Sequence, residues 1–93
     1  MDNIQMANTR WIRSPFVFNG KELIEELSFF NDGGAKIVNY RRCEVGSKDL
    51  GSCYVYKVEG NTVSFADKQF EVDQEKTTLV QLPEKEAKYT RND

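Results

Sequence analysis

Residues 56–65 read Tyr-Lys-Val-Glu-Gly-Asn-Thr-Val-Ser-Phe, and this stretch decides the fold. Apolar and polar side chains alternate on both sides of Gly60-Asn61, the pattern of two antiparallel strands joined by a tight turn. Further turns separate short alternating runs at Asn19-Gly20, Asp32-Gly33-Gly34, around Lys48, Asp67-Lys68, Glu75-Lys76 and Pro83-Glu84-Lys85. The seven turns predict eight strands, at 10–18, 21–31, 35–45, 51–59, 62–66, 69–74, 77–82 and 86–91. Only the run from Leu23 to Phe30 also fits the start of a helix.

The strand register follows from the turns, because a slip of one residue would move a whole strand to the other face. A hairpin centred on Lys48 places Tyr40 opposite Tyr56, and a turn at Asp67-Lys68 places Phe65 opposite Phe70. One apolar face then continues through seven strands: Leu27, Phe29, Val38, Tyr40, Tyr56, Val58, Val63, Phe65, Phe70, Val72, Leu79 and Tyr89. On the first strand, a two-residue turn at Asn19-Gly20 directs Trp11 outward, whereas a β-bulge would direct it inward.

A meander with one apolar face leaves two unpaired edges, and closure into a barrel removes them. We therefore predict an all-β protein: an eight-stranded antiparallel up-and-down meander closed into a small lipocalin-like β-barrel. A five-stranded barrel of the oligonucleotide-binding type is the alternative. Residues 1–9 are predicted to be a flexible polar N-terminal segment, and residues 10–93 a single barrel domain.

Composition limits the possible functions of this 93-residue chain. Thirteen basic and fifteen acidic residues give a net charge of −2, which argues against a nucleic-acid partner. The chain has no histidine, so Ser-His and Cys-His catalysis is excluded and a zinc site is disfavoured. No apolar run is long enough to span a membrane. We expect no catalytic residues, no metal and no cofactor, and a monomeric protein.

Cys43 and Cys53 flank the long turn, and the hairpin centred on Lys48 places them directly opposite each other. Opposed residues on antiparallel strands have Cα atoms about 4.5–5.5 Å apart, within the range of a disulfide. The alternative is a pair of free thiols. A disulfide would favour a periplasmic or secreted location over the cytoplasm, with the export signal absent from this chain.

Several short motifs are similar to one family. They are Trp11, Glu26-Leu27-Ser28-Phe29 followed by Asp32-Gly33, residues 56–63, Thr78-Leu79-Val80, and Tyr89-Thr90-Arg91. Together they resemble the lipocalin-like small barrels of the calycin superfamily, especially short bacterial domains of secreted lipoproteins. The resemblance implies that Arg91 of the last strand covers Trp11 of the first and closes the barrel. It also implies a role in binding a small molecule or a protein. The family's glycine two residues before the tryptophan is Thr9 here.

The predicted register also places one charged side chain on the apolar face. Arg42 lies opposite Tyr54, with Glu25 on its other side, so that Arg42, Tyr40, Tyr54 and Tyr56 line one end of the barrel. An inward guanidinium there could hold the anionic head of an amphipathic ligand, with its apolar tail against Phe29, Phe65 and Phe70. The alternative is that Arg42 pairs with Glu25 and plugs a barrel filled by its own aromatic side chains. The protein would then be an interaction module, inhibitor or accessory subunit, which contacts another protein through Leu50, Phe16 and Phe18.

Overall fold

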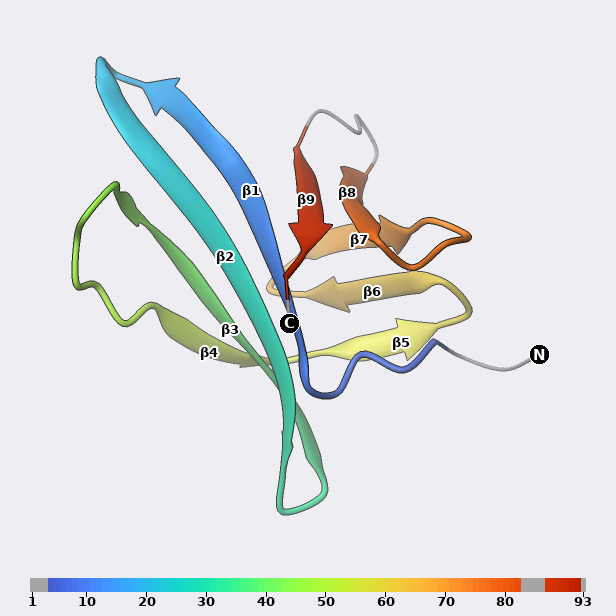
Figure 1. The fold of residues 1–93 in the computed structure, drawn as a ribbon. Helices are drawn as coiled ribbons and strands as arrows, with labels where there is room; N and C mark the ends of the chain where they lie inside the picture. Colours follow the sequence, from blue (N-terminus) through green and yellow to red (C-terminus); the bar gives the residue numbers. More distant parts are fainter. Residues whose placement is uncertain (1–3, 83–86, 93) are drawn as a thin grey trace.

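The computed structural model describes residues 4–82 and 87–92, and these residues form one antiparallel sheet without a helix (Figure 1). Alternation of apolar and polar residues produces most of the strands, because one face of each of them lies in the interior. Nine strands lie in this described part of the chain: β1 (Thr9–Phe18), β2 (Lys21–Asp32), β3 (Ala35–Glu44), β4 (Ser52–Val55), β5 (Lys57–Glu59), β6 (Thr62–Phe65), β7 (Lys68–Val72), β8 (Thr78–Leu82) and β9 (Lys88–Arg91).

The sheet is nearly closed into a barrel. Its strand order is β4-β3-β2-β1-β9-β8-β7-β6-β5, and only Tyr56 separates β4 from β5 in the chain. The Tyr56 N–H donates to the Lys36 carbonyl on β3 at 3.1 Å. The next residue, Lys57, pairs instead with Ser64 on β6. The chain thus changes neighbours at Tyr56. The predicted count of eight strands is wrong, because the predicted strand 51–59 is split there.

Several predicted registers are confirmed. Phe29 pairs with Val38 across the β2–β3 turn, and Val58 pairs with Val63 across the β5–β6 turn. Leu79 of β8 pairs with both Val72 of β7 and Tyr89 of β9, as the alternation requires. The predicted turn at 83–85 lies outside the described residues. Where a short turn is predicted at the right residues, the predicted register of the two strands that it joins is therefore correct.

Two registers differ from the prediction by an even number of residues. Tyr40 pairs with Ser52 and not with Tyr56, because the pairing of β3 with β4 is centred on Gly46 and not on Lys48. Val63 pairs with Phe70, because Ala66 and Asp67, both with positive φ, form the β6–β7 turn. An even slip keeps every side chain on its face, so the predicted apolar face remains the interior face.

A β-bulge decides which way β1 faces. The register shifts between Arg13, which pairs with Glu25, and Phe16, which pairs with Leu23. Pro15 lies in this interval and has no backbone N–H for a regular ladder. The extra residue turns Trp11 inward, where it is only 1% exposed. The alternative that the sequence left open, a bulged first strand, is the one adopted.

The core lies between the strands at the centre of the barrel. Its members are buried and mostly aromatic or β-branched: Met6, Trp11, Leu27, Phe29, Val38, Tyr56, Val63, Phe65, Phe70, Val72, Leu79, Ala87 and Tyr89. Met6 belongs to the segment that was predicted to be flexible and polar, yet it is 3% exposed. The Ile4 N–H also donates to the Gly60 carbonyl, at 3.0 Å. Residues 4–8 thus contribute to the barrel.

Candidate functional site

Glu25 is the centre of a polar cluster inside one end of the barrel. Its side chain points inward from β2 and the residue is 4% exposed. The Tyr40 hydroxyl donates to Glu25 Oε2 at 2.9 Å, and the Tyr89 hydroxyl donates to the same oxygen at 2.5 Å. Arg13 Nη1 donates to Oε1 at 2.9 Å, and Arg42 Nε lies 3.9 Å from it. The cost of burying the carboxylate is offset by these donors.

Positive charge exceeds negative charge around Glu25. Arg13, Arg42 and Lys68 converge on this end from three strands, and Glu25 already has close donors in Arg13 and two tyrosines. Arg42 is held more loosely, because its closest approach to Glu25 is 3.9 Å and its side chain is 41% exposed. A partly hydrated guanidinium beside a satisfied carboxylate can still bind an anion.

Aromatic rings fix the positions of the cations. Arg13 Cζ lies 3.8 Å from the ring centroid of Phe16, and Arg42 Cζ lies 5.0 Å from that of Phe18. Lys68 Nζ lies 4.1 Å from the centroid of the Tyr40 ring. Burial lowers the pKa of Lys68, an effect that the Glu25 charge opposes and the Arg42 charge increases. Each of the three cations thus lies against an aromatic ring.

The two tyrosines of the cluster are held in their neutral form. Burial, followed by the negative charge of Glu25, raises the pKa of Tyr40 to about 12. Burial and the hydrogen bond to Glu25 raise the pKa of Tyr89 far above its ordinary value. Both hydroxyls thus act as hydrogen-bond donors to the carboxylate across the physiological pH range.

The cations open onto a depression that we call the mouth. It has a volume of about 390 Å³ and is lined by Tyr40, Arg42, Asp49, Gly51, Ser52, Tyr54, Ala66 and Lys68. Gly51 lets the chain approach β3 closely here, because its φ is +77° and an added Cβ would lie 2.4 Å from the Tyr40 carbonyl oxygen. The mouth joins side chains from β3, β4, the β6–β7 turn and the loop before β4.

The structure brings some of the predicted site residues together and separates others. Tyr40, Arg42 and Tyr54 line the mouth, although Tyr54 pairs with Val38 and not with Arg42. Tyr56 was also predicted there, but it is buried, with its ring centroid 5.0 Å from that of Phe29. Because Ser52 stands opposite Tyr40, four residues earlier in the chain than the predicted partner Tyr56, Tyr56 falls deeper in the barrel.

The predicted surface for an apolar tail is part of a continuous set of ring contacts. Phe65 stacks on Phe70 at 5.2 Å between centroids and meets Phe29 edge to face at 6.4 Å. Tyr54 lies over Phe65 at 5.9 Å, and Phe70 meets Tyr89 at 5.8 Å. These three phenylalanines pack against the barrel's own rings.

The first and last strands are adjacent. β1 pairs with β9, and Trp11 lies directly opposite Arg91. Arg91 Cζ is 6.0 Å from the centroid of the Trp11 ring, at the outer limit of a cation–π contact. The structure therefore brings together the two residues that were predicted to close the barrel.

The cysteines do not face each other. Cys43 pairs with Ile24 on β2, Cys53 pairs with Asn39 on β3, and both are free thiols, the first buried and the second exposed. The residue opposite Cys53 precedes Cys43 by four positions (43 − 39), which is roughly 13 Å along a strand. The predicted opposition of the two cysteines is wrong, and a disulfide would require a register change.

Two cations near Glu25, Lys68 and Arg13, were not predicted from the sequence. Lys68 was assigned to a turn, but it pairs with Phe65 and so shares the interior face. Arg13 was not assigned to the interior, because only the β-bulge turns it toward Glu25. A turn placed at Ala66-Asp67 would have predicted that Lys68 points inward, and a bulge placed beside Pro15 would have predicted the same for Arg13.

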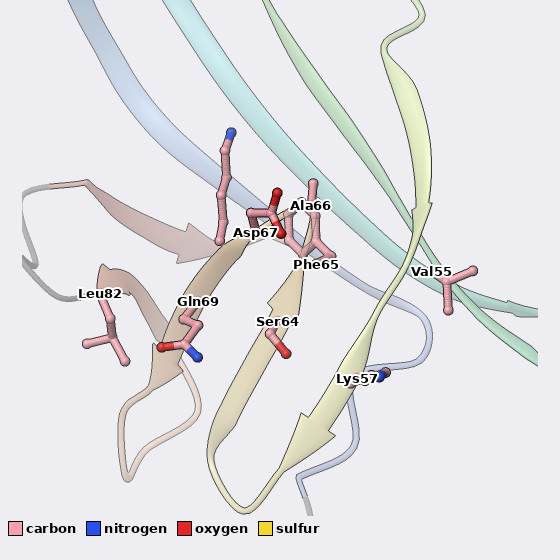
Figure 2. Close-up of a pocket in the computed structure, with 9 residues that line it drawn as sticks. Val55, Lys57, Ser64, Phe65, Ala66, Asp67, Gln69 and Leu82 are labelled. Atoms are coloured by element: carbon pink, nitrogen blue, oxygen red, sulfur yellow. The ribbon is translucent and has the colours of Figure 1, made fainter.

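The barrel is incompletely closed between Val55 of β4 on one side and the β6–β7 turn on the other, and we call this gap the seam. A second hollow adjoins the mouth and lies along the seam (Figure 2). It has a volume of about 500 Å³ and is lined by Val55, Lys57, Ser64, Phe65, Ala66, Asp67, Lys68, Gln69 and Leu82. Val55 and Lys57 flank it on one side, and the β6–β7 hairpin with Leu82 flanks it on the other. Ala66 and Lys68 line both hollows, so the seam leads into the mouth.

Comparisons of the chain with family models, with curated proteins and with solved structures find no match. The described part of the chain contains no cluster of three or more side chains suited to holding a metal ion. Within residues 4–82 and 87–92, no helix has the length and apolarity needed to cross a membrane. Any functional conclusion therefore depends on the site itself.

Proposed function

We propose that this protein is a non-enzymatic binding domain that holds the anionic group of a small amphipathic ligand at the mouth. One observation carries the proposal. Arg42 and Lys68 face a depression of about 390 Å³ while the neighbouring carboxylate, Glu25, already accepts hydrogen bonds from Arg13, Tyr40 and Tyr89. The two cations are thus available to an external anion.

The surroundings of the mouth suit an amphipathic ligand. Phe18, Val45 and Leu50 belong to the two chain segments next to the mouth and are large, exposed apolar side chains. Leu50 is 86% exposed although it precedes Gly51 of the mouth lining. A carboxylate or phosphate at Arg42 with an apolar portion along these side chains would satisfy both features.

The test is a titration of the protein with decanoate, followed by amide NMR spectra. Wild-type protein should show saturable shifts at Arg42, Ser52 and Lys68, and uncharged decanamide should bind at least about tenfold more weakly. Arg42→Gln should weaken decanoate by about tenfold. Arg41→Gln is the matched control, because Arg41 directly precedes Arg42 on β3 but pairs with Glu26 at 3.4 Å on the outer face. Equal weakening by both variants, or shifts that avoid the mouth, would reject the proposal.

A second candidate is a protein-interaction module whose barrel is filled by its own side chains. The ring contacts of Phe29, Phe65 and Phe70 favour it, because they occupy the interior that a ligand's tail would otherwise enter. Binding of decanoate at the mouth would argue against this candidate. Absence of such binding, together with a protein partner lost on Leu50→Ser, would support it.

A further inference from the structure

The outer edge of β4 has no neighbouring strand among the described residues. β4 and β5 are the two ends of the strand order, and β5 continues the chain past the seam. All four residues of β4 are exposed, and the Val55 side chain is 65% exposed. An exposed strand edge of this kind is a template for pairing with another strand.

The direction of the backbone groups on β4 follows from one hydrogen bond. The Tyr56 N–H points to β3, where it donates to Lys36 at 3.1 Å. N–H groups alternate in direction along a strand, so that of Tyr54 also points to β3. The N–H groups and carbonyls of Cys53 and Val55 therefore point away from β3, into the seam.

The seam has the form of a channel for one extended segment. On its interior side it is covered by the Tyr54 ring, which lies over Phe65 at 5.9 Å. The hollow of about 500 Å³ lies between the β4–β5 side and the wall formed by Asp67 and Leu82 (Figure 2). A strand added to the outer edge of β4 would lie about 4.8 Å from it, on the side where Val55 lines this hollow.

The charges at the seam and mouth favour an acidic occupant. The side chains lining the two hollows include three cations, Lys57, Lys68 and Arg42, and two carboxylates, Asp67 and Asp49. Asp49 already accepts a hydrogen bond from the Gly51 N–H at 2.9 Å. A second copy of this chain would bring these cations against the same cations, because a two-fold interface places each patch on itself.

We propose that β4 pairs with an extended peptide of another protein, antiparallel to it, whose C-terminal carboxylate is held at the mouth by Arg42 and Lys68. β4 runs from Ser52 at the mouth to Val55 at the seam. An antiparallel peptide therefore enters at Val55 and ends at Ser52, with its terminal carboxylate beside the two cations. This inference rests on the proposed function in one respect, since it assigns the anion of the mouth to a peptide terminus.

The experiment compares two forms of one short peptide of alternating threonine and valine, acetylated at its N-terminus. One form has a free C-terminal carboxylate and the other a C-terminal amide. Hydrogen exchange of the Cys53 and Val55 amides of the full chain is followed by NMR. The free acid should slow exchange at both amides by about tenfold or more and bind about tenfold more tightly than the amide form. Arg42→Gln should reduce the difference between the two forms, because only Lys68 then remains to hold the carboxylate.

Variants at Val55 test the strand pairing independently. Val55→Pro removes an N–H that points into the seam and should abolish peptide binding, whereas Val55→Thr keeps the N–H and should bind as the wild type does. If Val55→Pro does not fold, the comparison of the two peptide forms on wild-type protein still decides.

Three results would overturn the inference: unchanged exchange at Cys53 and Val55, equal affinity for the two peptide forms, or protection of these amides by rising protein concentration alone. The last result would assign the edge to a second copy of the chain. If decanoate still binds at the mouth, the peptide inference fails alone; if decanoate also fails, the proposed function fails with it.

Discussion

The two ends of the barrel interior differ sharply although the same strands build both. On β2, Leu27 is fully buried among apolar side chains, whereas Glu25, two residues earlier on the same face, is buried among hydroxyls and guanidinium groups. On β3, Val38 belongs to the dry end and Arg42 to the mouth. The comparison teaches that alternation decides only which residues point inward; the position along the strand decides whether the interior is dry.

The dry and polar ends also differ in what they contribute. Buried apolar area stabilises the fold at about 25 cal/mol per Å². A buried carboxylate surrounded by cations contributes less net stability, because desolvation consumes most of the Coulombic gain. The charges of Glu25, Arg13 and Arg42 therefore add less to stability than the apolar side chains of the dry end do.

The largest effect is expected from truncation of the dry end. Leu27→Ala and Phe65→Ala should each lower the free energy of unfolding by about 2–5 kcal/mol, because each leaves a cavity in the core. Urea unfolding followed by tryptophan fluorescence measures this, since Trp11 is buried in the same core. A loss below about 1 kcal/mol at either position would contradict the assignment of the interior face.

A smaller effect is expected at the boundary between the mouth and β3. Gly51→Ala should cost about 1–3 kcal/mol, because φ is +77° and the added Cβ meets the Tyr40 carbonyl oxygen. Gly60→Ala is the matched control: its φ is +64°, but no atom lies within 4 Å of the added Cβ. Urea unfolding should show a greater loss for Gly51→Ala, and equal losses would mean that the close approach to β3 is unimportant.

The contrast between these two glycines also explains how much of the fold the sequence could predict. Short turns that need a positive φ, such as Gly33-Gly34 and Gly60-Asn61, determine their strand registers locally. The chain from Val45 to Gly51 has no such short-range rule, and its path depends on the packing of Gly51 against β3. The even slip in this register left the interior face correct but moved Tyr56 and Cys53 to different partners.

The same reasoning applies to the candidate site. Arg42 and Tyr40 were predicted because alternation on β3 places them inward, and Glu25 was predicted opposite Arg42 by the short β2–β3 turn. Arg13 and Lys68 could not be predicted from alternation alone, because a bulge and a turn shifted by one residue determine their directions. Irregularities of the backbone thus supplied half of the charged cluster.

Neutralising Glu25 should separate stability from binding at the polar end. Glu25→Gln keeps the size of the side chain but leaves Arg13 and Arg42 without a counter-charge, so unfolding should become easier by about 1–3 kcal/mol. The same change raises the positive charge of the mouth, and decanoate should bind several-fold more tightly. Urea unfolding and calorimetric titration measure the two effects. Weaker decanoate binding by a folded Glu25→Gln protein would mean that Glu25 positions the cations rather than competing for them.

The smallest effect is a loss of stability at alkaline pH, to which the polar end contributes together with Tyr56, whose pKa is also raised by burial. The pKa of Tyr40 is about 12 in the folded protein, against an ordinary value of 10.0, and the pKa of Tyr89 is also raised. The folded state therefore holds these protons more tightly than the unfolded state does. Their contribution to stability is complete below pH 10 and decreases as the pH rises from 10 toward 12. Urea unfolding at a series of pH values measures this slope, and Tyr40→Phe should reduce it.

Lys68, whose pKa is lowered, contributes the opposite dependence, because its folded state loses the proton first and stability then rises with pH. A slope that Tyr40→Phe leaves unchanged would mean that Tyr40 does not contribute to the alkaline transition.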